Sequence, residues 1–256
     1  MVRIFFALVF LIASYSQACA RTWHVEPDGS GDAPTIAAAI DSSVAGDVIE
    51  MACGTYIEWG LLVKSGITIR SETGQPDCVT IDGNQPTGFG SIFGCWSVDN
   101  TTVIEGLTIT GGRAYDLTYG MAGGGMVISS GSDLTVKRCQ ITGNYAKAGG
   151  GVSISLSHPT FVECDISENE CEFYPGGVEV GLGASFTAYE TSILSNLSGL
   201  EYPDGSVRSG SEAFFYCCDI EVDNWFFEGS YLIDNENCDP VGSKIQSWGS
   251  LKVLFR

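Results

Sequence analysis

The sequence predicts an all-β fold, a single-stranded right-handed parallel β-helix (a solenoid) with a short N-terminal capping helix. Three observations lead to it: one phrase recurs at a nearly fixed interval, the apolar segments are short and β-branched, and Gly, Asn and Asp separate them. A fixed period in the twenties is typical of solenoids. Short alternating segments bounded by turn residues are typical of strands, whereas a leucine consensus and a helical period are both missing.

The recurring phrase is clearest in "CQITGNYAKAGGGVSIS" at 139–155 and "CDISENECEFYPGGVEV" at 164–180. Its central isoleucines, spaced by 32, 25, 27 and 27 residues, are Ile109, Ile141, Ile166, Ile193 and Ile220. The copies then reach a glycine turn that ends at Met126, Val152, Val178 and Val207. The long first interval indicates one inserted loop, "RAYDLTYGMA" at 113–122. Dividing the body of the chain by the period gives about seven coils.

Residues at one position of the phrase are expected to form ladders, because adjacent coils lie about 4.8 Å apart. The isoleucines would form an inward apolar ladder. A second buried ladder would contain Leu107, Cys139, Cys164, Thr191 and Cys218. A third would occupy a tight turn, where Asn and Asp tolerate left-handed backbone, and would contain Asn144, Asn169, Asn196 and Asp223.

The segment "APTIAAAIDSSVAGD" at 33–47 predicts a helix that covers the first coil. Pro34 suits a first helical turn, Gly46 suits the end, and the apolar face carries Ile36, Ala39, Ile40 and Val44. The expected organisation is a signal peptide at 1–20, an N-terminal strand and capping helix at 21–47, the β-helix at 48–235 and a tail at 236–256. The tail, which ends in "SWGSLKVLFR", is either a cap on the last coil or a secretion tag.

The first twenty residues predict export from the cell. Arg3 precedes the apolar run "IFFALVFLIA", and Ala18-Cys19-Ala20 fits the small-residue pattern before a cleavage site. A lipoprotein with Cys19 acylated is the weaker alternative. After cleavage near Ala20 the product would be secreted, either extracellular or at the cell surface. No later segment is apolar enough to span a membrane, so no integral membrane segment is expected.

Charge and cysteine content narrow the class of protein further. The chain without its signal peptide holds 11 Lys and Arg against 31 Asp and Glu, which argues against nucleic acid and anionic membranes as partners. Such an acidic balance is compatible with divalent cations outside the cell. Nine cysteines remain after Cys19, an odd number, so at least one thiol must be free unless two chains pair through it.

A resemblance can be stated for the region from about 22 to 225. The segment "PTIAAAIDSSVAGDVIEMACGTYIEWGLLVKSGITIRSE", followed by "CVTIDG", resembles the opening of pectin-lyase-like right-handed β-helix proteins of the secreted bacterial type. The resemblance implies the fold. It implies little about activity, because this superfamily contains lyases, hydrolases, isomerases, adhesins and proteins without known activity.

The catalytic motifs that the resemblance would imply are missing, so no catalytic residue is assigned. The chain has no Asp-His pair followed by Arg-x-Pro-x-x-Arg, no Asp-Asp, Gly-His-Gly and Arg-Ile-Lys set, and no Gln-Asp pair. The most basic candidate, Lys137-Arg138, is expected to lie one coil from Glu163 and two from Glu190, in a ladder of charges. An arginine paired with carboxylates stays protonated and makes a poor base.

Two groups of residues are candidates for binding. Calcium takes six to eight oxygen ligands, and stacked coils could supply them from Glu163, Asp165, Glu168, Asp219 and Asp223. The alternative for these carboxylates is a solvated acidic face. Aromatic rings that stand shortly before the glycine turns could lie against sugar rings, and these are Tyr119, Tyr174 and Tyr202, with Tyr115 nearby. The alternative is a structural tyrosine ladder, and Lys147 interrupts the series.

Three functions therefore stay open. The leading hypothesis is a secreted β-helix that binds, or displays surface toward, extracellular polysaccharide without catalysis. The second is an enzyme, either a divergent polysaccharide lyase assisted by Ca²⁺ or a glycoside hydrolase. The third is a structural or adhesive solenoid at the cell surface, held there by anchoring machinery. The missing catalytic motifs favour the first and third, and the inserted loop favours the first over the third.

Overall fold

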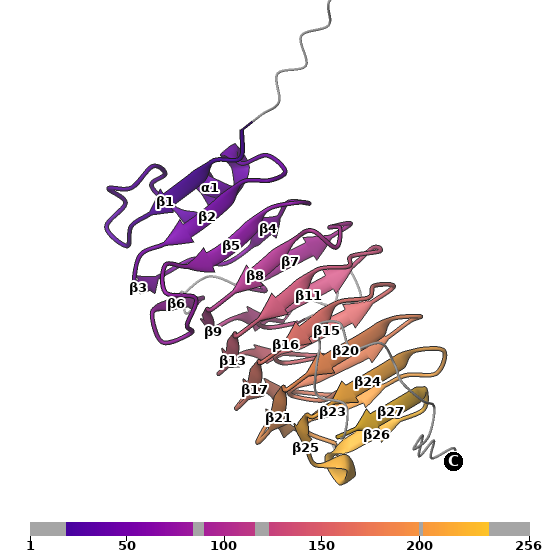
Figure 1. The fold of residues 1–256 in the computed structure, drawn as a ribbon. Coiled ribbons are helices and arrows are strands. Elements are labelled where there is room, and N and C mark those ends of the chain that lie inside the picture. Colours follow the sequence, from indigo (N-terminus) through magenta and orange to yellow (C-terminus); the bar gives the residue numbers. More distant parts are fainter. Residues whose placement is uncertain (1–18, 84–89, 116–122, 200–201, 236–256) are drawn as a thin grey trace, which may run out of the picture.

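The computed structural model describes residues 19–83, 90–115, 123–199 and 202–235. Successive coils stack along one axis, from the helix α1 (Ile36–Ser42) at one end to the strands β25, β26 and β27 at the other (Figure 1). All the strand pairs in the described part are parallel, and they form four sheets. The predicted fold class, a parallel β-helix with a short N-terminal capping helix, is confirmed.

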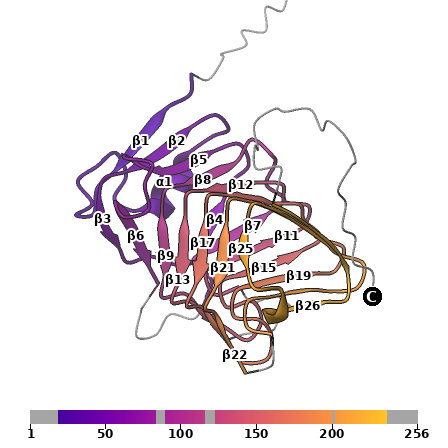
Figure 2. The ribbon, with the colours of Figure 1, turned by 60° about the horizontal axis from the view of Figure 1, so that its bottom comes forward.

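Sheet A has nine strands, in the order β1 (Thr22–Val25), β2 (Val48–Met51), β5 (Thr68–Ser71), β8 (Val103–Glu105), β12 (Thr135–Lys137), β16 (Thr160–Val162), β20 (Ser185–Tyr189), β24 (Glu212–Tyr216) and β27 (Ser230–Asp234). Sheet B has seven, in the order β3 (Gly54–Tyr56), β6 (Val79–Asp82), β9 (Thr108–Thr110), β13 (Gln140–Thr142), β17 (Asp165–Ser167), β21 (Ser192–Leu194) and β25 (Asp219–Ile220). Figure 2 shows β9, β13, β17 and β21 side by side.

Sheet C also has seven strands, in the order β4 (Leu61–Val63), β7 (Phe93–Trp96), β11 (Met126–Ser129), β15 (Val152–Ser155), β19 (Val178–Gly181), β23 (Gly205–Val207) and β26 (Trp225–Phe227). Sheet D has four two-residue strands, β10 (Arg113–Ala114), β14 (Tyr145–Ala146), β18 (Glu170–Cys171) and β22 (Leu197–Ser198). A short 3₁₀ helix, η1 (Val222–Asn224), precedes β26. The seven strands of sheets B and C agree with the number of coils expected from the period.

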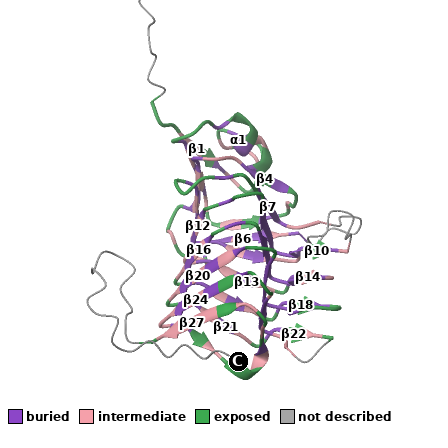
Figure 3. Ribbon diagram, turned by 90° about the vertical axis from the view of Figure 1, so that its right-hand side faces the viewer, coloured by how far each residue is buried: buried purple, intermediate pink, exposed green. Residues whose placement is uncertain are grey.

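Sheet D is the part of the coil that the sequence does not predict. Its strands project from the body of the stack, and the chain returns from them to sheet C through the glycine turns (Figure 3). A Cβ on Gly150 would collide with the carbonyl oxygen of Glu170, and one on Gly176 with the carbonyl oxygen of Leu197. These glycines therefore allow two backbone segments to lie in contact, which is why the phrase keeps them.

The isoleucine ladder is confirmed and is longer than predicted. Strand pairing in sheet B joins Tyr56 and Ile81 to Ile109, Ile141, Ile166, Ile193 and Ile220. The pairing also corrects one expected alignment. Gly205 lies beside Val178, and Val207 lies beside Val180, so the fourth glycine turn is displaced by two residues relative to the others.

The cysteine ladder is confirmed as well, since Cys139, Cys164 and Cys218 are buried at the corner between sheets A and B. The Cys139 thiol donates to the carbonyl of Lys137 at 3.3 Å, and burial raises the pKa of this thiol to about 12. Elsewhere Cys53 and Cys78 form a disulfide. The prediction of at least one free thiol is confirmed by the buried, unbridged Cys139 and Cys164.

The asparagine ladder needs two corrections. Asn144, Asn169 and Asn196 are buried and linked side chain to side chain, but the next member is Asp204, whose Oδ1 accepts from Asn196 Nδ2 at 3.0 Å. Asp223 lies instead in η1 and is exposed. The left-handed backbone falls on the residue before each asparagine, such as Glu168 (φ 56°), and not on the asparagine itself.

The N-terminal end is covered by α1, which contacts β1, β2 and β4. Thr35 is the N-cap and its hydroxyl accepts from the backbone N–H of Ala38 at 3.1 Å, so the helix begins at Ile36 and the expected start at Pro34 is two residues too early. Ile36, Ala39 and Ile40 are buried, as predicted. Val44 is exposed, because the helix ends at Ser42 and Val44 lies beyond the C-cap.

Candidate functional site

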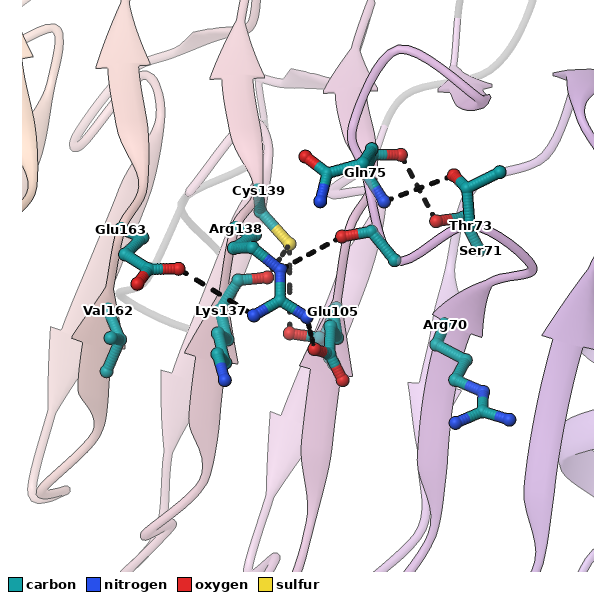
Figure 4. Close-up of polar contacts among 12 residues, drawn as sticks. Arg70, Ser71, Thr73, Gln75, Glu105, Lys137, Arg138, Cys139, Val162 and Glu163 are labelled. Carbon is teal, nitrogen blue, oxygen red and sulfur yellow. Dashed lines mark hydrogen bonds and ion pairs between the residues drawn. The ribbon is translucent and has the colours of Figure 1, made fainter. Parts of the chain in front are cut away.

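The row of charges around Arg138 is a closed structural network (Figure 4). The Arg138 guanidinium forms ion pairs with Glu105 on one neighbouring coil and with Glu163, at 3.7 Å, on the other. Its Nε also donates to the carbonyl of Gly74 at 3.0 Å. Because the Arg138 guanidinium is engaged by carboxylates on both sides, its role is structural and it is not suited to act as a general base. The predicted pairing with Glu163 is observed.

The five carboxylates proposed for calcium do not form a common ligand set. Glu163 pairs with Arg138, and Asp165 and Asp219 share an outward row of sheet B with Ser192 between them. No three of the five bring their oxygens within 4.8 Å of one another, although all of them lie in the described part. Glu168 lies in the turn before β18 and Asp223 in η1, and both are exposed. Their arrangement gives no support to a shared calcium site.

The four candidate tyrosines lie in different surroundings. Tyr119 is outside the described residues. Tyr115 follows β10, and its ring packs against Tyr145 with centroids 4.9 Å apart. The Tyr174 ring lies beneath the Arg208 guanidinium at 4.4 Å, whereas Tyr202 packs against Phe226 at 5.3 Å. Within the described part, no ring contact joins Tyr174 and Tyr202, so the expected continuous tyrosine rim is not formed there.

Tyr174 and Tyr202 nevertheless both border one surface, the outer side of sheet C, which we call the sheet C face. Strand pairing aligns its central outward row, which consists of Leu62, Gly94, Val127, Ser153, Glu179, Ser206 and Phe226. Seven strands at the usual spacing give the face a length of roughly 30 Å. The row follows the stack from β4 to β26, but its five middle members, from Gly94 to Ser206, are buried, and only Leu62 and Phe226 at its two ends are exposed.

Exposed aromatic side chains follow this face from its first strand to its last. Trp59 stands just before β4, Trp96 ends β7, Tyr174 precedes β19 and Phe226 lies in β26, and these side chains are 38%, 44%, 38% and 39% exposed. The Trp96 ring fills the space beside Gly94 that a Cβ would occupy. Leu156 and Leu182, which directly follow β15 and β19, are also exposed, in left-handed conformations (φ 48° and 49°).

A polar cluster lies among these apolar groups. Arg208 Nη2 is 2.7 Å from Glu179 Oε1, and the Ser153 hydroxyl donates to Glu179 Oε2 at 3.4 Å. Burial would lower the pKa of Arg208, but its contact with Tyr174 and the Glu179 carboxylate outweigh that effect and raise it. The Ser206 hydroxyl oxygen, next to Glu179 on the same row, is buried without a hydrogen-bond partner in the described structure.

The chemistry available on the sheet C face is therefore recognition. Arg208 remains a cation, and its guanidinium and Glu179 offer hydrogen bonds beside flat aromatic rings. Glu179 and Arg208 were missed from the sequence because each looks like an ordinary solvent-facing residue. The available indication was the sequence of β19, "VEVG", in which one charge stands between two valines at a position that proves to be buried.

Comparisons with known proteins bear on the fold. A family model described as right handed beta helix region matches residues 55–198. No curated protein matches the chain in sequence. Among solved structures, the pectate lyase Pel9A is 14% identical with a TM-score of 0.48, and the match covers 78% of this chain and 63% of the lyase. The chain thus spans less than two thirds of that enzyme.

Two pectin methylesterases also match in the comparison with solved structures. PemA from Erwinia chrysanthemi is 11% identical with a TM-score of 0.47, and the match covers 83% of this chain and 81% of that enzyme. The enzyme from Aspergillus niger, in deglycosylated form, is 16% identical with a TM-score of 0.40, and the match covers 87% and 86%. At these identities the likeness concerns the path of the chain alone. Among the described residues, no helix has the length and apolar character needed to cross a membrane.

Proposed function

The chain belongs to the right-handed β-helix family, and from that premise we propose that it is a secreted protein that binds an extended polysaccharide along the sheet C face. One observation carries the proposal: exposed aromatic side chains border this face at β4, β7, β19 and β26, from Trp59 to Phe226. These side chains, and not the buried central row, would make the contact, since exposed apolar groups that gather on one side of a protein mark interaction sites. Aromatic rings suit sugar rings because they present a flat apolar face.

Hydrogen bonds from the polar cluster would fix the orientation of the bound polysaccharide on the face. Arg208 and Glu179 lie between Tyr174 and Phe226, and together they offer donors and acceptors to sugar hydroxyl groups. A site that hydrogen-bonds hydroxyl groups discriminates against ligands that lack them, since its buried polar atoms would then stay unpaired.

The test is retention of the purified mature protein on a panel of immobilised polyuronates and neutral glycans. Trp96→Ala and Tyr174→Ala should each weaken retention about tenfold, because stacking contributes about 0.5–1.5 kcal/mol beyond the buried area. Val44→Ala, an exposed apolar residue at the opposite end of the molecule from the last coils, is the matched control and should leave retention unchanged. Equal retention of all four proteins would refute the proposal.

The same incubations distinguish the remaining functions. Unsaturated products or new reducing ends that depend on Ca²⁺ would identify an enzyme and overturn the assignment of pure binding. Neither retention nor cleavage of any glycan would leave a structural or adhesive solenoid. Export is tested separately, by N-terminal sequencing of the protein from the medium, where a mature start at Arg21 is expected.

A further inference from the structure

A second surface feature lies outside the sheet C face. A hollow of about 350 Å³ occupies the corner where sheets B and D meet. Three successive coils supply its side chains: the first supplies Arg113 and Tyr115, the second Tyr145, and the third Glu168 and Glu170. The turn at 143–144 forms its floor. The volume lies within the range of small-ligand sites.

Strand pairing fixes the order of these groups. Arg113 pairs with Tyr145, and Tyr145 pairs with Glu170, so a cation, an aromatic ring and a carboxylate follow one another along one outward row. Neighbouring members are about 4.8 Å apart at the backbone. Tyr115 packs its ring on Tyr145 at 4.9 Å, and Glu168 adds a second carboxylate from the turn before β18. The hollow thus has a positive end, an aromatic centre and a negative end.

These charges are not neutralised by one another or by other groups of the described structure. No ion pair involves Arg113, Glu168 or Glu170 among the residues described, whereas Arg21, Arg70, Arg138 and Arg208 all have carboxylate partners. The Tyr145 hydroxyl stays protonated, because burial and then the nearby Glu172, Tyr115 and Glu170 raise its pKa. It can therefore donate a hydrogen bond beside the ring.

The arrangement disfavours ligands whose charges are all of the same sign. An anionic ligand would gain at Arg113 but meet two carboxylates, and a cationic ligand would gain at the carboxylates but meet the guanidinium. A ligand that carries both charges satisfies both ends. Charge-assisted hydrogen bonds are about twice as strong as neutral ones, which makes each end a determinant of specificity.

We propose that this hollow binds a zwitterionic stretch of glycan, with a uronic-acid carboxylate at Arg113, a sugar ring on Tyr145 and the ammonium group of an amino sugar at Glu168 and Glu170. The site rests on the proposed polysaccharide-binding function and adds a ligand class to it. It would hold one short stretch of a chain, whereas the sheet C face holds an extended one.

The experiment compares glycans that differ in one charge. The probes are hyaluronan oligosaccharides, the same oligosaccharides after removal of their N-acetyl groups, and chitosan oligosaccharides of equal length, titrated by calorimetry into the full-length mature protein. The de-acetylated, zwitterionic probe should bind at least tenfold more tightly than its acetylated parent and than chitosan, given the strength of hydrogen bonds to charged groups.

Single-residue variants assign the preference to the hollow. Glu170→Gln should reduce the preference for the zwitterion over the acetylated parent to about threefold or less, and Arg113→Gln should do the same for the preference over chitosan. Both residues are exposed, so both variants should fold, which circular dichroism checks. The matched controls are Glu212→Gln and Lys137→Gln on sheet A, which should leave the preferences unchanged.

The outcomes separate this inference from the function on which it rests. The proposal for the hollow would be refuted if the zwitterion and its acetylated parent bound with equal affinity, or if the preferences survived both substitutions. The proposed function would still stand if retention remained sensitive to Trp96→Ala. Failure of every glycan to bind would overturn both.

Discussion

Two arginine-bearing rows of the same β-helix, one around Arg138 and one around Arg113, have opposite electrostatic outcomes. Arg138 stands between Glu105 and Glu163, so each neighbouring coil supplies a counter-charge. Arg113 stands next to Tyr145, and the carboxylate of Glu170 comes only one coil later. Stacking decides the difference: charges that alternate from coil to coil neutralise one another, and an uncharged residue between them leaves both ends open to a ligand.

The largest effect on stability is expected when a side chain is removed from a row whose buried polar groups all have hydrogen-bond partners. Asn169 accepts from the backbone and side-chain nitrogens of Asn144 and donates to Ile141 and Asn196. Asn169→Ala should lower the free energy of unfolding by about 3–5 kcal/mol, since each buried group left unpaired costs about 1–3 kcal/mol. Denaturant unfolding measures this, and Asn100→Ala, at an exposed site, is the control. Equal midpoints for the two variants would contradict the ladder's structural role.

The two arginines themselves give the next largest effect. Arg138→Gln should lower the free energy of unfolding by about 2 kcal/mol, because it leaves the half-buried Glu105 without its counter-charge. Arg113→Gln should change it by less than about 0.5 kcal/mol, as expected for an exposed side chain without a partner. Thermal or denaturant unfolding of both variants checks the difference. A loss of equal size would show that the Arg113 row is also structural.

The smallest effect concerns the thiol ladder behind the Arg138 row and depends on pH. Burial raises the pKa of Cys139 to about 12, above that of an exposed thiol, so the folded state holds this proton more tightly than the unfolded state. The resulting stability is complete below the unfolded pKa and is lost as the pH rises from about 9 toward 12. By pH 10 the loss should be about 1.5 kcal/mol.

Comparison with Cys139→Ala isolates this contribution from the other groups that titrate in alkali. The variant should be less stable at neutral pH, because it leaves a cavity, but its stability should fall less steeply between pH 9 and 11. Parallel declines in the two proteins would exclude the thiol as the cause.

The parts of the fold that follow from periodicity could be predicted from the sequence. Ile141 and Ile166 align because every coil repeats the same in-and-out alternation, and the same holds for Cys139 and Cys164. The alignment fails in the last coil, where the 3₁₀ helix η1 takes the place of the turn that carries the asparagine in earlier coils. Asp223 lies in η1, and Asp204, which directly precedes β23, bonds to Asn196 instead.

The candidate sites could be predicted only in part, because their contacts depend on which strands pair and in which register. Tyr174 and Tyr115 could be singled out as aromatics near glycine turns, but their contacts with Arg208 and Tyr145 depend on the register of paired strands. Sheet D, which sets the order of the hollow, consists of two-residue strands that carry no recognisable hydrophobic pattern. The carboxylates proposed for calcium share a stretch of sequence but are spread over separate rows.

The constant register of the coils also bears on how such a protein can change during evolution. Val152 lies beside Val178, so deletion of residues 152–177 would join two equivalent points and place Ile141 beside Ile193. Duplication of the same stretch would lengthen the molecule by one coil. Gene rearrangements of this size preserve every ladder, whereas insertion of a single residue within a strand reverses which side chains face inward. The length of the sheet C face can therefore change in evolution by one whole coil at a time.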